Sequence, residues 1–189
     1  MRKYVSVKNG FATLADKVFI GENVPESAIT IPVLKASTGN WTRALFPYDS
    51  KGKPLSESVV FANPAVKSYF LANKELLLKG KPEFDGWYLY GRTQAIADVH
   101  KPKLSINALV RHENDFKLVE MPSGTGVYSG LYAIANEDVS FGILKEIIQS
   151  RDFVSYVKLL KKYKSGGYYT FNSKDIENYL NYSLTLMNK

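Results

Sequence analysis

Cysteine is absent from the 189 residues of this chain. Disulfides, thiolate nucleophiles and cysteine-based zinc sites are therefore excluded. Histidine is scarce, since only His100 and His112 offer an imidazole. We therefore do not expect a histidine-rich metal site either.

Long hydrophobic runs are also missing. No apolar stretch approaches the length of a bilayer span, and residues 1–10 lack the apolar centre of a signal peptide. The hydrophobic share of 45% and the aromatic share of 13% suit a packed globular protein. We therefore expect a soluble, cytoplasmic protein without a membrane partner, forming one domain or two small subdomains.

Recognisable catalytic motifs are lacking as well. The chain contains no GxGxxG or GxxxxGK[ST] loop after a strand and no GxSxG elbow. Its carboxylates are scattered, and no two of them are marked as an acid/base pair. We expect no catalytic residue, no metal site and no cofactor in this chain, so that the chain alone is not an enzyme.

Positive charge is present in excess. The net charge is +7, and the surplus is +3, +2 and +2 in residues 1–60, 61–120 and 121–189. Such a surplus favours polyanionic partners such as double-stranded DNA, because phosphate neutralisation releases counterions, although many basic proteins bind none. Since the surplus is spread along the chain, a basic face must be assembled by folding.

Hydrophobic patterns predict an α+β fold. A mostly-β part with one helix is expected in residues 1–80, followed by an α+β part in residues 81–189, with a linker at Lys79–Pro82. Asn63 is a good N-cap for the helix that starts at Pro64 and runs to Gly80. Strands are predicted at 4–7, 18–20, 29–35, 44–48, 104–110, 116–120 and 127–133, and further helices at 138–149, 152–163 and 173–186.

The segment 158–171 is the first candidate for binding chemistry. Lysines 158, 161, 162 and 164 fall on the last turns of a predicted helix, which Ser165, Gly166 and Gly167 end. In the functional interpretation, Lys162 and Lys164 hold phosphates while the turn at Ser165 and Gly166 lets backbone amides approach DNA beside Tyr168. The alternative is a solvated helix end followed by a core strand.

A second candidate is the segment 87–94, with Arg92, Thr93 and Gln94 on a turn after an aromatic strand. Arginine and glutamine read guanine and adenine edges in the major groove. The alternative is that Trp87 and Tyr90 belong to the core and that Arg92 makes a structural salt bridge. Weaker candidates for contacts to DNA are Lys35, Ser37 and Thr38 in the polar loop 35–40, together with Lys101 and Lys103.

Six stretches together resemble the specificity region of adenine-specific DNA methyltransferases, of the TaqI-like C-terminal type that also occurs in bifunctional restriction–modification enzymes. They are NGFATLADKVFI (9–20), IPVLKASTGNW (31–41), ALFPYDSKGK (44–53), WYLYGRTQAI (87–96), KPKLSINAL (101–109) and YKSGGYYTFNSKDIENYL (163–180). The SGGYYTF sequence before a capped helix contributes most to the resemblance.

This resemblance implies a target-recognition domain, which forms one wall of a DNA cleft opposite a catalytic domain that binds S-adenosylmethionine. The family's catalytic Asn/Asp-Pro-Pro-Tyr/Phe motif is missing, because Asn63-Pro64 is followed by alanine and valine. We therefore expect a fragment, or a chain whose catalytic partner lies upstream or on another chain. Two alternatives remain open, a metal-dependent nuclease and a protein-interaction module that docks a catalytic subunit.

Overall fold

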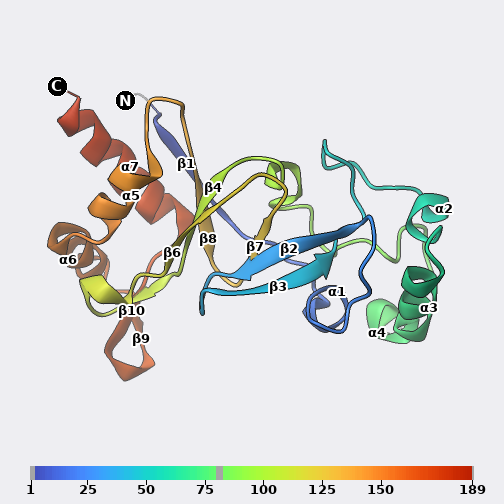
Figure 1. Cartoon of the computed structure of the whole chain (residues 1–189). Coiled ribbons are helices and arrows are strands. Elements are labelled where there is room, and N and C mark those ends of the chain that lie inside the picture. The colour runs from blue at the N-terminus through green and yellow to red at the C-terminus, as the bar shows by residue number, and fades with distance from the viewer. Residues whose placement is uncertain (1–2, 80–82, 189) are drawn as a thin grey trace.

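Two open β-sheets form the centre of an elongated α+β molecule (Figure 1). The structure is a computed structural model that describes residues 3–79 and 83–188. The first sheet is antiparallel, in the order β1 (Val5–Asn9), β8 (Leu131–Ala135), β4 (Lys103–Ile106) and β6 (Leu118–Met121). The second has the order β3 (Asn40–Leu45), β2 (Thr30–Lys35) and β7 (Gly126–Tyr128), with β2 and β7 parallel. The predicted α+β class is confirmed at this level.

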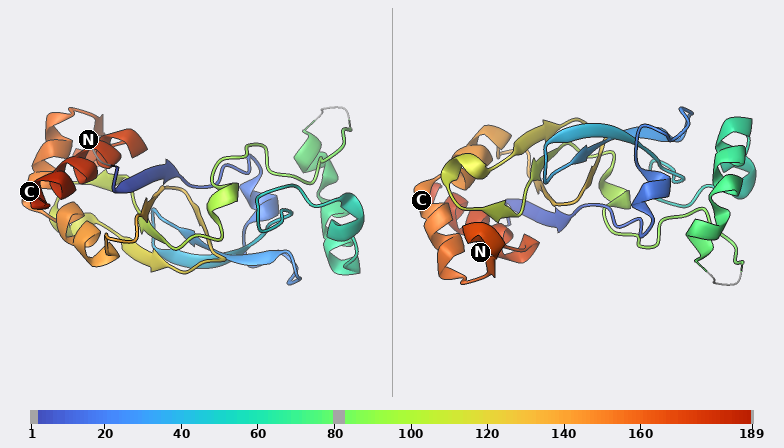
Figure 2. Two further views of the ribbon diagram at one scale, coloured as in Figure 1. Left: turned by 90° about the horizontal axis from the view of Figure 1, so that it is seen from above. Right: turned by 90° about the horizontal axis from the view of Figure 1, so that it is seen from below.

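Helices cover the first sheet and form with it the helical lobe, which contains both ends of the described chain (Figures 1 and 2). These helices are α5 (Phe141–Ile148), α6 (Arg151–Leu159) and α7 (Ser173–Met187). Each begins where the sequence has a capping side chain, since Ser140, Ser150 and Asn172 accept hydrogen bonds from backbone N–H groups of the first turn. Leu104, Ile106 and other apolar residues of the sheet pack against Leu144, Phe153 and Leu180 of the helices.

The opposite end is the aromatic lobe, built around the second sheet and four short helices. These are α1 (Asp16–Phe19), α2 (Glu57–Val60), α3 (Pro64–Ala72) and α4 (Lys74–Leu78). Tyr90 lies at its centre, with its ring within 6.1 Å of four other aromatic rings. Its hydroxyl donates to the Leu45 carbonyl at 2.8 Å, so the polar end of this buried side chain is satisfied.

Strands from both halves of the sequence pair in both sheets. β8 lies beside β1 and β7 lies beside β2, and a small cluster of Leu34, Met121 and Tyr132 with their neighbours packs between the sheets. Gly10 allows a close approach of the two backbones, because a Cβ at this position would lie 2.5 Å from the Val127 carbonyl oxygen. Residues 80–82 of the predicted linker lie outside the described residues, and the division at residue 80 stays a prediction.

Several predicted elements are wrong in detail. Residues 18–20 are not a strand, because Val18 and Phe19 belong to α1 and turn both side chains into the core. The helix that starts at Pro64, capped by Asn63 as predicted, breaks at Asn73, whose φ of −105° is not helical. Segment 85–88 forms turns rather than an aromatic strand. In these places buried aromatic packing outweighs local periodicity.

None of the helices in the described residues has the length and apolar character of a membrane span.

Candidate nucleic-acid interface

The segment from residue 161 to residue 170 is a β-hairpin and not the predicted helix end. Helix α6 ends at Leu159, and Lys161 adopts a left-handed φ of 54° that turns the chain away from the helix axis. The strands β9 (Tyr163–Lys164) and β10 (Tyr168–Thr170) follow, joined by a 3-10 turn, η3 (Ser165–Gly167). Gly166 and Gly167 have φ values of 71° and 75°, which glycine adopts without strain. The hairpin projects from the helical lobe (Figure 1).

The predicted site residues of this hairpin differ in their surroundings. Lys162 Nζ lies 2.5 Å from Asp175 Oδ2, and this carboxylate also accepts a hydrogen bond from the Asn172 backbone at the start of α7. Lys162 is therefore held in an ion pair with the cap of a helix. Lys164, Ser165 and Gly166 are exposed at the tip, and Tyr168 is half-buried.

A loop with many internal hydrogen bonds, residues 107–117, lies next to the hairpin. The loop contains strand β5 (Leu109–Val110), which pairs with β10. Asn107 organises the loop, accepting from the Lys117 backbone at 2.6 Å and donating to the Leu109 and Asp115 carbonyls at 2.8 and 3.1 Å. Asp115 in turn accepts from the backbone N–H groups of Arg111 and His112 at 2.7 and 3.0 Å. These bonds, the one from Arg111 foremost, lower the pKa of the Asp115 carboxyl.

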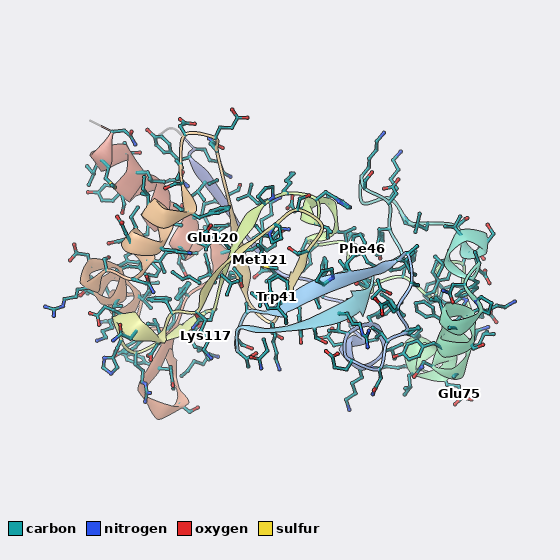
Figure 3. The ribbon with its side chains drawn as sticks, viewed as in Figure 1. Trp41, Phe46, Glu75, Lys117, Glu120 and Met121 are labelled. Carbon is teal, nitrogen blue, oxygen red and sulfur yellow. The ribbon has the colours of Figure 1, made fainter. Side chains whose placement is uncertain are left out.

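Two cationic side chains of this loop lie across glycine turns. The stem of Arg111 passes over Gly167, and its guanidinium carbon lies 4.3 Å from the centre of the Tyr168 ring. The stem of Lys117 passes over Gly39 in the turn between β2 and β3, and its Nζ lies 3.4 Å from the Ser37 carbonyl oxygen. Figure 3 shows Lys117 near the edge of the molecule to which the hairpin projects.

Three segments thus meet around one hollow of about 300 Å³, namely the β2–β3 turn, the 107–117 loop and the hairpin. We call this surface the hairpin face. Its hollow is lined by Ser37, Asn107, Leu109, Asn114, Asp115, Lys117 and Tyr168. The structure therefore brings the predicted residues Ser37 and Tyr168 to one place, with the exposed Thr38 in the same turn as Ser37.

The hairpin face is rich in cations. Arg111, Lys117 and Lys164 are exposed, and Lys35 is half-buried at the end of β2. Asp115 is the one carboxylate among the described residues that line the hollow, and it accepts hydrogen bonds from two backbone N–H groups. A surface of this composition attracts anions such as phosphate groups.

The second predicted site lies elsewhere. Thr93 and Gln94 line another hollow, of about 430 Å³, which shares no described lining residue with the one on the hairpin face. Gln94 Nε2 donates to the Gly10 carbonyl at 2.6 Å, so this side chain ties the 92–95 segment to the end of β1. Arg92 and Thr93 are exposed beside it.

Lys101 belongs to a charge cluster near this second hollow. Its Nζ lies 2.8 Å from Asp98, in the 3-10 turn η1 (Ile96–Asp98), and Lys8 Nζ lies 2.6 Å from the same carboxylate. The Tyr132 hydroxyl donates to it at 2.9 Å. Burial alone would raise the pKa of Asp98, but the bonds from Lys101, Lys8 and Tyr132 outweigh it and hold the pKa at about 2.

The surface role predicted for Lys103 is wrong. This side chain is 2% exposed, and its Nζ donates to the Val99 and Thr125 carbonyls at 3.1 and 2.8 Å. Burial lowers the pKa of Lys103 to about 8, because the charged form loses its hydration, although nearby Asp98 acts in the opposite direction.

We expect the buried Lys103 to make the protein more stable at alkaline pH. The unfolded state binds this proton up to a pKa of about 10.4, whereas the folded state releases it near pH 8, so the free energy of unfolding rises between these values. From pH 7 to pH 9.5 the gain is about 2 kcal/mol, measured by urea denaturation. Lys103→Met should abolish the rise, whereas Lys158→Met, at an exposed position, should keep it. An equal rise in the Lys103 variant would contradict this expectation.

Sequence reasoning missed Arg111, Asn114 and Lys117. A usable signal was present, since residues 111–115 (RHEND) form a polar, turn-prone stretch between two predicted strands. The sequence could not predict that this stretch lies beside the hairpin, because the contact depends on the pairing of β5 with β10.

No group of three or more histidine, cysteine or acidic side chains suited to a metal ion occurs within residues 3–79 and 83–188. In comparisons with known proteins, no protein-family model matches the chain, and no curated protein matches it. The resemblance to adenine-specific DNA methyltransferases therefore stays a prediction that rests on the sequence motifs.

Proposed function

We propose that this chain is a sequence-specific recognition domain for double-stranded DNA, with the fold of a DNA methylase specificity domain. In this proposal it belongs to an adenine-specific DNA methyltransferase of a restriction–modification system. It holds the duplex while a catalytic domain, on the same or a partner chain, methylates an adenine amino group with S-adenosylmethionine.

The observation that carries the proposal is the meeting of three loops on the hairpin face. Each loop combines a glycine or asparagine turn with cationic or hydroxyl side chains, and the loops come from distant parts of the sequence. Phosphate contacts position a duplex, and polar side chains beside them read the base edges. We assign Lys164, Lys117 and the exposed backbone around Gly166 to phosphates.

The remaining predicted residues receive secondary roles. Lys35, Ser37 and Thr38 lie in or beside the β2–β3 turn and are proposed to contact the backbone of the same duplex. Lys162 must exchange its ion pair with Asp175 before it binds a phosphate, which makes it a weaker contact than Lys164. The segment Arg92–Gln94 and Lys101, around the second hollow, are proposed to contact DNA outside the part held by the hairpin face.

The proposal is tested by fluorescence-anisotropy titration with a random duplex pool at low and moderate salt, followed by sequencing of the bound fraction. We expect salt-sensitive binding and an enriched motif that contains adenine. Lys164→Ala should weaken binding to all sequences alike and reduce the slope of log affinity against log salt by about 1. Lys51→Ala, an exposed lysine in a turn of the aromatic lobe, should change neither quantity.

Absence of duplex binding at low salt would contradict the proposal. So would binding without any enriched motif, because a recognition domain must discriminate between sequences.

A second candidate function, docking of a catalytic subunit, is favoured by exposed apolar side chains on the aromatic lobe. Leu14, Leu76 and Phe84 are 57, 56 and 52% exposed beside hollows of about 570 and 470 Å³. Contiguous apolar surface of this kind is typical of protein–protein contacts. The same titration separates the candidates, because a module that only docks a protein binds no duplex.

A further inference from the structure

We propose that Arg111 reads a guanine edge and that Tyr168 positions it for this task. This inference rests on the proposed function, since it presumes a duplex on the hairpin face. In this inference Arg111 supplies the discrimination between sequences, whereas other residues of the hairpin face supply most of the affinity.

Arg111 is held in place from several sides although it is exposed. Its stem lies over Gly167, and its guanidinium lies over the Tyr168 ring at 4.3 Å. Its Nε is 3.9 Å from Asp115 Oδ2, and its Nη1 is 3.5 Å from the Gly166 carbonyl oxygen. A side chain ordered in advance loses less conformational entropy on binding than a free one.

These contacts leave part of the guanidinium without a partner. Asp115 lies near Nε and the Gly166 carbonyl lies near Nη1, whereas Nη2 makes no hydrogen bond or ion pair among the described residues. The two terminal nitrogens of a guanidinium carry parallel N–H donors, the arrangement that matches O6 and N7 of guanine in the major groove. The side chain is 44% exposed, so a ligand can reach it.

The neighbouring carboxylate favours a base edge over a phosphate. Asp115 offsets part of the guanidinium charge, and its negative charge repels an approaching phosphate. A guanine edge is uncharged and keeps its two acceptors. Lys117 and Lys164 have no carboxylate partner among the described residues, which suits them to phosphate contacts.

Arg111 is also better prepared for readout than Arg92. Within the described residues, Arg92 makes no hydrogen bond, ion pair or ring contact, and it is exposed. A free arginine must be ordered entirely by the DNA, which costs conformational entropy.

The experiment compares the bound-fraction motifs of the wild-type chain and its variants at low salt, with affinities for the enriched and a scrambled duplex. Arg111→Ala should lose preference for guanine at one position, by about 5- to 150-fold, and change the affinity for the scrambled duplex far less. Arg111→Lys should lose a smaller part of the same preference, because lysine keeps the charge and N–H donors but not the planar fork. Lys67→Ala, which removes an exposed cation of α3 in the aromatic lobe, should leave the motif unchanged.

Two substitutions of Tyr168 test whether its ring positions Arg111. Tyr168→Leu removes the ring under the guanidinium and should lose part of the same guanine preference, whereas Tyr168→Phe keeps the ring and should restore it. A role of Tyr168 in stability alone would not change one position of the motif.

The outcomes separate the inference from the function on which it rests. Equal losses on enriched and scrambled duplexes in Arg111→Ala, or a motif that is unchanged, would overturn Arg111 as the reader while the recognition domain stands. If the wild-type chain binds no duplex at low salt, both proposals are overturned.

Discussion

Replacing Asn181 by alanine is expected to lower the free energy of unfolding by about 3 kcal/mol, because buried backbone groups then lose their partners. Asn181 lies in α7, is 5% exposed and faces β1. Its Oδ1 accepts from the backbone N–H groups of Tyr4 and Val5 at 2.6 and 3.1 Å, and its Nδ2 donates to the Val5 carbonyl at 3.0 Å. One side chain thus joins the first strand to the last helix of the helical lobe.

Urea denaturation followed by circular dichroism measures this effect. Tyr182→Ala, at the neighbouring position that is 56% exposed, should change the free energy of unfolding by no more than about 0.5 kcal/mol. Asn181→Asp keeps the acceptor but loses the donor and buries a charge, so it should also be strongly destabilising. A loss below about 1 kcal/mol in Asn181→Ala would show that other contacts hold the helix to the strand, such as apolar packing and the hydrogen bond from the Val7 N–H to Glu177 Oε2 at 2.7 Å.

Asp98→Asn is the second change with a large expected effect, a loss of about 3 kcal/mol at pH 7. The pKa of Asp98 is about 2 in the folded protein and about 3.9 in an unfolded chain, so folding favours the ionised form. This stability is fully present above pH 4 and is lost as the pH falls through 2. At pH 3 it should be about half as large.

The measurement is the difference between wild type and Asp98→Asn in the free energy of unfolding at pH 7 and at pH 3. Glu137→Gln, which removes an exposed carboxylate, serves as the matched control and should change stability at pH 7 by less than about 0.5 kcal/mol. A difference that stays constant between the two pH values would mean that the ionised carboxylate is not what stabilises the cluster.

Local chemistry predicted much of the secondary structure. Asn63 caps a helix that starts at Pro64, because its side chain accepts from the two following backbone N–H groups. The apolar alternation at Leu104 and Ile106 corresponds to strand β4, and both side chains are fully buried. These features depend on residues a few positions apart, which a sequence displays directly.

The candidate site was predictable only in part. Polar turns at Ser37 and at Gly166 were identified from their composition, and both lie on the hairpin face. Arg111 was missed because its role depends on a ring 57 positions away in the sequence, at Tyr168. Lys103 was wrongly assigned to the surface because lysine is hydrophilic. The two core carbonyls that accept its hydrogen bonds could not be predicted from the sequence.

By itself the sequence determined the α+β class, the helix caps, the glycine turns and the surplus of positive charge. Only the tertiary structure decided which lysines are buried or paired, and which loops face one another. The physical reason is that caps and turns are satisfied within a few residues, whereas the hairpin face exists only after β5 pairs with β10 and β2 with β7. Such pairings are selected by the packing of the whole chain, because only the complete core compensates for the entropy of bringing distant segments together.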